Sequence, residues 1–362
     1  MKNVDLNELS KALHSIIDID EIDINKQMSK IYSDARLNSK GNKCLICGKS
    51  DVKFCNSHSI PQFCLRNISS TGKLSTTNEV IDMRFLLKKS AGINDAGTFK
   101  NICTTCDSTV FQDYENPETY EQRPNNRVLA EIALKCALKM IYKRNVEIEL
   151  YKIMFEMTSD PNTKIDIEIK TLDLGEYMEN MRKARSNVNS AVGNGYYLVY
   201  YKVLDYVVPY AFQSQIVLPV DLENKIINDI FTMRKNYQTK NLYICVFPLK
   251  TSTAIIIFVD NNEKRYKNFI KQFNCLSEPD KLALINFIII RFSEEVFYSD
   301  SASIKNVMQS DIFKEICGRT NDLMFTQEDL LFEDINKKKI ENCSLKDYKL
   351  LPNLLSEEYK LR

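Results

Sequence analysis

Six cysteines and one histidine lie between residues 41 and 120, and their spacing is suited to metal chemistry. Cys44 and Cys47 form one CxxC pair, and Cys103 and Cys106 form a second. A CxxC turn places two thiolates about 2.3 Å from one Zn²⁺, and two such turns complete a tetrahedron without another ligand. The two pairs therefore predict a structural zinc site that keeps no position open for a substrate.

The alternative is that these cysteines are unrelated buried thiols, because free cysteine is among the most buried residue types. Two CxxC pairs within one polar segment are hard to explain by packing alone, so metal binding is favoured. Cys55 and Cys64 have no partner at this spacing, and we expect them to be loop or core thiols.

A histidine, His58, follows the first pair in the stretch SHSIP. The ordinary imidazole pKa of about 6.5 lets this side chain accept a proton at neutral pH, as a general base does. Two other roles stay open: a hydrogen bond to a loop carbonyl, or binding to the zinc in place of a cysteine. The second histidine, His14, is expected to be an ordinary residue of an N-terminal helix.

The order CLICG, SHSIP, NICTTCD and FQDYE resembles the HNH-type endonucleases, which have a treble-clef zinc fold and a ββα-metal site. The resemblance covers residues 41 to 120, under a quarter of the chain, and is nearest to bacterial HNH-like proteins, several of them linked to phage defence. It implies that His58 activates water against a phosphodiester of nucleic acid, DNA more than RNA. A single Mg²⁺ or Mn²⁺ would stabilise the phosphate charge.

The chain departs from the HNH pattern at several positions. Ser57 stands where the family has an Asp that binds the catalytic metal, and Asp107 stands where it has His or Asn. Asp107 is an oxygen ligand suited to Mg²⁺, and Glu115, eight residues further along the expected helix 107–115, would face the same side. For the Asn that orients the base, Thr98 or Asn101 is the substitute.

A metal-dependent nuclease is the leading prediction, and the absence of the metal-binding Asp motivates a second function class as its alternative. In this interpretation residues 41–122 are a non-catalytic zinc module that binds nucleic acid or a protein within a defence assembly. An oligomer or a partner protein is compatible with either function.

A predicted basic stripe follows the cysteine-rich segment. Lys135, Lys139 and Lys143 are spaced by four residues on a predicted helix, where they could bind nucleic-acid phosphates. A solvated helix face is the alternative interpretation, and it is the more common one.

Composition sets the limits on the remaining function classes. The chain has 362 residues with 49 Lys and Arg against 48 Asp and Glu, so its overall charge gives no argument for nucleic acid. The longest apolar run, residues 282–290, is too short to span a membrane, and the N-terminus predicts a cytoplasmic protein. The motifs of P-loop, Rossmann, α/β-hydrolase and HExxH enzymes are absent from the sequence.

The expected fold class is α+β, with a small zinc-stabilised, treble-clef HNH-like domain and a larger domain of antiparallel sheet and helices. The expected division is residues 1–40 (N-terminal helical segment), 41–122 (zinc domain), 123–160 (connecting helix) and 161–362 (α+β domain of unknown role). Apolar periodicity predicts a helix at 125–145, and a capped helix begins at Ser277. Strands are predicted at 164–170, 195–204, 211–219, 241–247 and 253–260, the last two forming a hairpin.

Overall fold

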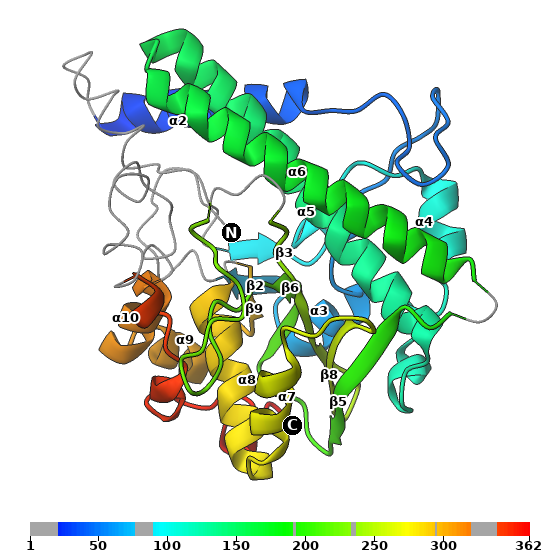
Figure 1. The fold of residues 1–362 in the computed structure, drawn as a ribbon, viewed down its shortest axis with the longest axis vertical. Coiled ribbons are helices and arrows are strands. Elements are labelled where there is room, and N and C mark those ends of the chain that lie inside the picture. The colour runs from blue at the N-terminus through cyan, green and yellow to red at the C-terminus, as the bar shows by residue number, and fades with distance from the viewer. Residues whose placement is uncertain (1–20, 77–89, 191–192, 233–236, 294, 320–338) are drawn as a thin grey trace.

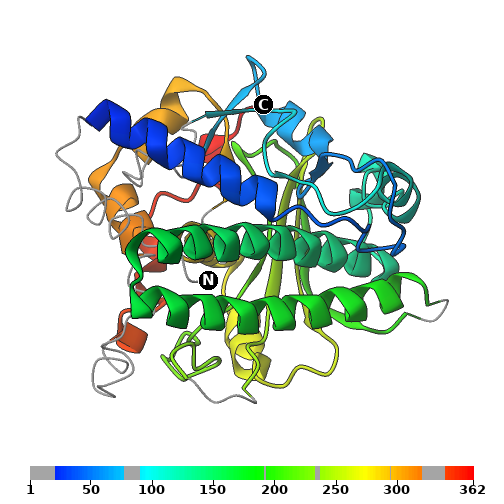
Figure 2. The same ribbon diagram turned by 90° about the horizontal axis from the view of Figure 1, so that it is seen from above.

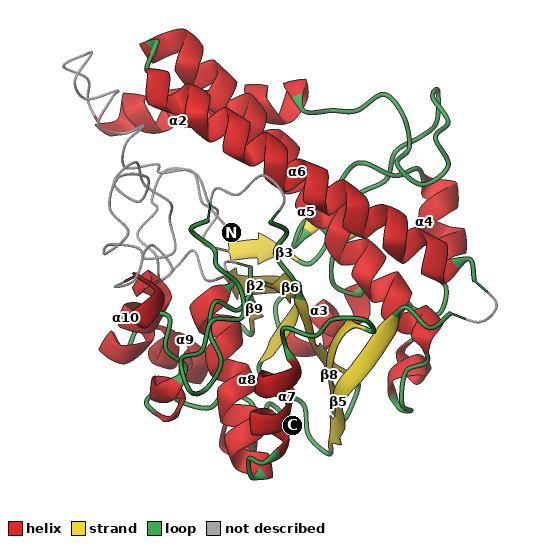
Figure 3. Ribbon diagram, in the orientation of Figure 1, coloured by secondary structure: helices red, strands yellow, loops and turns green. Residues whose placement is uncertain are grey.

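The structure, a computed structural model, describes residues 21–76, 90–190, 193–232, 237–293, 295–319 and 339–362, and it mixes helices with antiparallel sheets (Figures 1 and 3). The helices are α2 (Glu21–Asn38), α3 (Gln62–Ile68), α4 (Thr104–Val110), α5 (Asn126–Thr158), α6 (Pro161–Val188), α7 (Lys267–Asn274), α8 (Glu278–Phe292), α9 (Ala302–Met308) and α10 (Asp311–Gly318). The strands are β1 (Ser57–His58), β2 (Lys73–Thr76), β3 (Ser90–Gly92), β4 (Thr98–Phe99), β5 (Tyr196–Leu204), β6 (Tyr210–Ile216), β7 (Leu242–Pro248), β8 (Thr253–Asp260) and β9 (Phe297–Tyr298).

A seven-stranded sheet in the order β3-β2-β9-β6-β7-β8-β5 forms the centre of the molecule, and all its pairs are antiparallel. The predicted strands at 195–204, 211–219, 241–247 and 253–260 are confirmed as β5 to β8. The hairpin between β7 and β8 closes with a 2.8 Å bond from the Leu249 amide to the Ser252 carbonyl. Because β2 and β3 lie between the two CxxC pairs, the cysteine-rich segment supplies one end of this sheet.

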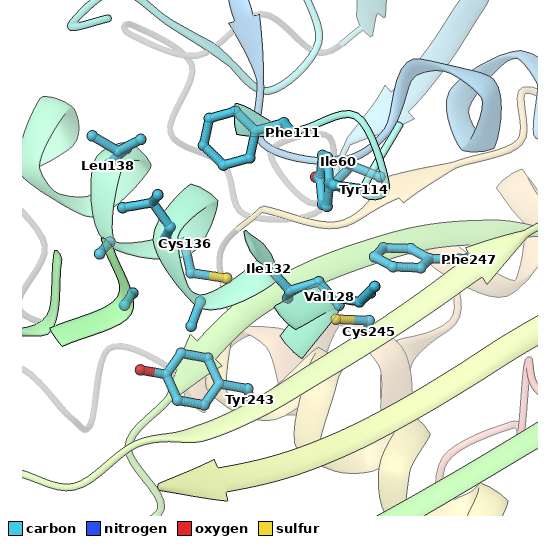
Figure 4. Packing of buried hydrophobic residues seen from close by; sticks show 14 of the residues in the cluster. Ile60, Phe111, Tyr114, Val128, Ile132, Cys136, Leu138, Tyr243, Cys245 and Phe247 are labelled. Carbon is cyan, nitrogen blue, oxygen red and sulfur yellow. The ribbon is translucent and has the colours of Figure 1, made fainter. Parts of the chain in front are cut away.

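The sheet separates two apolar layers, since alternate residues of a strand face opposite sides. Tyr243, Cys245 and Phe247 of β7 join the cluster that contains α5 and the cysteine-rich segment, as Figure 4 shows for part of it. Ile244 and Val246 face the other way, into the cluster that contains α7 and α8. The helix predicted from Ser277 is confirmed, and the Ser277 side chain caps α8 by accepting from the Asp280 amide.

Helices α5 and α6 form a long antiparallel hairpin, and α2 lies beside α5 (Figure 2). The strand predicted at 164–170 is wrong, because these residues belong to α6. Asp160 caps this helix by accepting from the Asn162 amide, and Pro161 occupies its first position, where the missing N–H costs nothing. The N-cap Asp160 followed by Pro161 is the sequence signal for the start of this helix, and the helix then packs against α5.

Met28, Ile31 and Ala35 of α2 pack against Val146 and Leu150 of α5. The expected N-terminal helical segment up to residue 20, with His14, lies outside the described residues. None of the helices in the described part of the chain combines the length and the apolar character that crossing a membrane requires.

Candidate metal centre and the His58 site

The structure brings the four predicted cysteines together. Cys44 begins a tight turn in which its carbonyl accepts from the Gly48 amide at 2.8 Å, and Gly48 has a φ of 73°, which glycine adopts without strain. Cys103 is the N-cap of α4, and Cys106 lies in the first turn of that helix. The Cys103 amide also donates to the Cys44 sulfur at 3.3 Å, so the two turns are already joined.

The geometry of the cluster fits a tetrahedral metal ion. All four sulfur atoms lie within 4.8 Å of one another, and those of Cys47 and Cys103 are 3.9 Å apart. A metal with sulfur ligands at about 2.3 Å requires sulfur–sulfur distances of about 3.8 Å. Burial raises the pKa of Cys44, but the amide donors of Cys47 and Cys103 outweigh it and hold this pKa at about 7, which favours a thiolate at this position. Burial and the neighbouring cysteines raise the pKa of Cys106, so a bound metal ion would have to displace its proton. These four side chains could therefore bind a metal such as zinc.

The two other cysteines of the segment stay outside this cluster, as predicted. The Cys55 sulfur donates to the Ile102 carbonyl at 3.5 Å, and burial, with Asp107 nearby, raises the pKa of this thiol to about 12. Cys64 is fully buried on α3 within the apolar cluster. Both are thiols of the loop and core.

His58 is positioned by the short β1–β4 ribbon. Its backbone pairs with Thr98, and its Nε2 atom lies 3.0 Å from the Ile93 carbonyl. A carbonyl only accepts, so Nε2 carries the proton and Nδ1 keeps its lone pair. Burial lowers the pKa of His58, which keeps the imidazole neutral at pH 7. Gly97, with a φ of 65°, lets the chain turn here, since a Cβ at this position would come within 2.7 Å of the Ser59 hydroxyl.

Neither residue expected to orient His58 does so in the structure. The Thr98 hydroxyl donates to the Asp95 carbonyl at 3.1 Å, and the Asn101 side-chain amide donates to the Leu138 carbonyl at 2.7 Å. The Ile93 carbonyl takes this role instead. Side-chain motifs contain no signal for a backbone acceptor 35 residues away, so sequence reasoning missed it.

A buried lysine occupies the centre of the expected catalytic group. The ammonium of Lys135 lies 2.8 Å from the Ser57 hydroxyl and 2.8 Å from Oδ1 of Asp107, and the Ser57 hydroxyl donates to Asp107 at 2.7 Å. Glu115 completes an ion pair with the same ammonium at 3.6 Å. The Phe111 ring centroid is 4.2 Å from the ammonium, a further stabilisation of the cation.

The two carboxylates beside Lys135 have pKa values that are shifted in opposite directions. Burial by itself would raise the pKa of Asp107, but Lys135 and Ser57 outweigh it and hold that pKa below its usual value. Burial raises the pKa of Glu115, and Lys135 offsets only part of that effect. Asp107 is therefore a carboxylate at neutral pH whose charge is matched by an ammonium inside the protein.

The structure corrects the expected position of Glu115. Helix α4 ends at Val110, and Glu115 follows in a turn in which its amide donates to the Phe111 carbonyl at 3.0 Å. Glu115 and Asp107 nevertheless approach the same atom, because both pair with Lys135. Phe111 is the C-cap of α4, and its side chain is fully buried against Lys135 of α5.

The predicted basic stripe does not lie on an exposed face of α5. The Lys135 side chain has no exposed surface, so a phosphate outside the protein does not reach it. Lys139 is 13% exposed and pairs with Glu295 at 3.0 Å. Lys143 is half-buried and interacts with Glu147 and Glu295. Helix α5 is covered by the sheet, by α2 and by the cysteine-rich segment, which is why these lysines turn inward.

Comparison of the chain with protein families, with curated proteins and with solved structures gave no match in any of the three.

Proposed function

We propose that residues 41–122 form a zinc-stabilised, HNH-like module and that the ammonium of Lys135, which belongs to the following helix α5, replaces its catalytic divalent ion. In this proposal the protein binds nucleic acid or a partner protein without cleaving phosphodiester bonds. The observation that carries it is the 2.8 Å distance from Lys135 to both Ser57 and Asp107.

The four cysteine sulfur atoms are the ligands that support zinc as the bound metal. Four cysteines from two CxxC turns are the set that zinc prefers, and the sulfur spacing agrees with its bond lengths. Four thiolates leave no position for a water, so the ion would hold the segment together and supply no chemistry.

In this proposal, Lys135 opposes the binding of a second metal ion at Asp107 and Glu115. Mg²⁺ binds carboxylate oxygens at about 2.0 to 2.1 Å and needs open oxygen ligands around it. Oδ1 of Asp107 already accepts from both Lys135 and Ser57, and Glu115 is drawn to the same ammonium. A divalent ion at Asp107 would lie within a few ångströms of this cation, whose repulsion opposes binding. Lys135 cannot withdraw to solvent, since its side chain is enclosed.

His58 supports the second candidate, an active HNH-like nuclease. The Ile93 carbonyl holds Nε2, so a neutral imidazole presents the unprotonated Nδ1 as a general base requires. This candidate requires a divalent ion, and Asp107 and Glu115 could hold it only after Lys135 had left them.

The test compares the parent protein with His58→Ala and Lys135→Ala, each incubated with plasmid DNA and with RNA in Mg²⁺ or Mn²⁺. We expect the parent and His58→Ala to be equally inert. Lys152→Ala changes an exposed lysine of α5, the helix that carries Lys135, and is the matched control for Lys135→Ala. Calorimetric titration with Mn²⁺ supplies a second measurement, in which the zinc-loaded parent should bind no further ion. Cleavage by the parent that is lost in His58→Ala would instead establish the nuclease.

A further inference from the structure

We propose that four lysines around the cysteine cluster form a surface that contacts the phosphates of DNA. These residues, named here the knuckle lysines, are Lys43, Lys49, Lys53 and Lys100. The inference deepens the proposed function, because it selects nucleic acid as the partner and locates the contact away from the predicted stripe on α5.

Backbone hydrogen bonds bring the knuckle lysines together around the two CxxC turns. The Cys44 amide donates to the Lys49 carbonyl at 3.0 Å, so Lys49 lies across the turn from Lys43, the neighbour of Cys44. The Thr104 amide donates to the Lys53 carbonyl at 3.0 Å, which fixes Lys53 beside the second pair. Lys100 precedes Asn101, whose carbonyl accepts from the Leu45 amide at 3.0 Å.

The ammonium groups of the knuckle lysines face solvent and are not held in ion pairs by the carboxylates that the structure describes. All four residues are exposed, and within the described part of the chain none of them has an ion pair. Asp51 is the one acidic residue between positions 40 and 53. A zinc ion with four thiolates carries a formal charge of −2, so with Asp51 it offsets three of the four positive charges and leaves the surface positive. The contrast with Lys135 and Lys139 is clear, since carboxylates hold both of those.

The character of this surface fits a phosphate backbone better than a protein. Protein interfaces have an apolar or aromatic centre. The large exposed apolar side chains of the described chain are Leu37, Met157, Ile165, Leu172, Tyr197, Ile226 and Leu350, all outside residues 40–56 and 97–106. Lysines on a short, metal-held loop match repeated phosphate contacts, which carry affinity but no sequence information. We therefore expect binding without sequence preference.

The experiment measures binding of a fluorescent 20-base-pair duplex at several salt concentrations, without Mg²⁺ or Mn²⁺. One variant changes the four knuckle lysines to Gln. The control changes to Gln four exposed lysines that lie on or next to α7 and α9, helices whose apolar side chains belong to the opposite layer: Lys264, Lys267, Lys271 and Lys305. We expect the knuckle variant to lose more than about tenfold in affinity and its salt slope to fall by about one for each lysine in contact. The control should stay within about twofold, with zinc content equal in all three proteins.

Equal affinity of the parent and the knuckle variant would overturn the inference, as would a parent that binds no duplex. Binding of polyglutamate as tight as DNA and dependent on the same lysines would assign the surface to an acidic protein and also overturn it. Cleavage of DNA by the parent in Mg²⁺ would contradict the proposed function alone, because the binding assay contains no divalent ion of this kind. The two failures are therefore distinguishable.

Discussion

The Nζ atom of Lys135 lies 2.8 Å from Oδ1 of Asp107, and this contact joins the fully buried part of α5 to the first turn of α4. Removal of one partner of a buried ion pair leaves an uncompensated charge and costs about 3 to 5 kcal/mol. Asp107 is 27% exposed and Glu115 41% exposed, so water lowers this cost.

We expect Lys135→Met, which keeps the side-chain length, to lower the free energy of unfolding by about 2 to 3 kcal/mol, measured by urea denaturation. Lys152→Met is the control, because the Lys152–Glu149 pair on the same helix is exposed and should cost under about 1 kcal/mol. The double variant Lys135→Met with Asp107→Asn should recover part of the loss. Equal effects of Lys135→Met and Lys152→Met would contradict the role assigned to the buried ammonium.

The cysteine cluster predicts the metal content of the protein. Purified parent should contain about one zinc per chain by elemental analysis, because the four sulfur atoms fit one tetrahedral ion. Cys103→Ser should lose the zinc, and the segment should then become sensitive to protease, since metal binding and folding are linked. Cys55→Ser, which changes a thiol outside the cluster, should keep the full content. Zinc retained in Cys103→Ser would show that another ligand set holds it.

A buried carboxyl group on α5 predicts a pH dependence of stability. Burial raises the pKa of Glu131 to about 7, although it accepts hydrogen bonds from Arg127 at 3.1 Å and from the Tyr114 amide at 2.9 Å. The folded state therefore holds this proton more tightly than the unfolded chain does. The stabilisation is complete below the ordinary Glu pKa of about 4.5 and is lost as the pH rises through about 7.

Unfolding free energies measured between pH 5 and 8 test this effect. Glu131→Gln should remove a decline on the order of 2 to 3 kcal/mol that the parent shows over this range. Glu149→Gln, at a partly exposed carboxylate of the same helix, should leave the decline unchanged. A parallel pH profile for the parent and Glu131→Gln would refute the assignment.

The imidazole of His58 should titrate below the ordinary histidine range, because burial disfavours its charged form. Its contribution to stability is therefore present above pH 6.5 and is lost as the pH falls through its lowered pKa. Proton NMR can follow this directly, since the chain has two histidines and His58→Ala removes one set of ring signals. A midpoint above 6.5 for the signal lost in His58→Ala would be inconsistent with the buried, neutral imidazole.

Local spacing predicted the parts of this fold that depend on neighbours in the sequence. The CxxC pairs gave the four-cysteine cluster, and alternation gave β5 to β8, because both patterns reflect the local period of the chain. Residues 164–170 alternate in the same way, yet they lie in α6, since a capping Asp160 and a first-turn proline start a helix before them.

The position of Lys135 could not follow from its spacing, because its partners are 20 to 78 residues away. One signal was nevertheless present. From Val128 to Leu138 all residues but Glu131 and Lys135 are apolar, which is typical of a helix buried on every side. In such a helix a charged side chain must find a partner within the protein, and it is a poor candidate for a phosphate contact.

The strands β2 and β3 lie inside the loop that the two CxxC pairs close, and they belong to the same sheet as β6 and β9. At the other end of the chain, the guanidinium of Arg362 donates to the carbonyls of Asn67 and Lys250. The cysteine-rich segment is thus not a unit that can be excised. A fragment ending at residue 122 would expose the unpaired edge of β2 and the apolar side of α3, so we expect it to aggregate even with its metal bound.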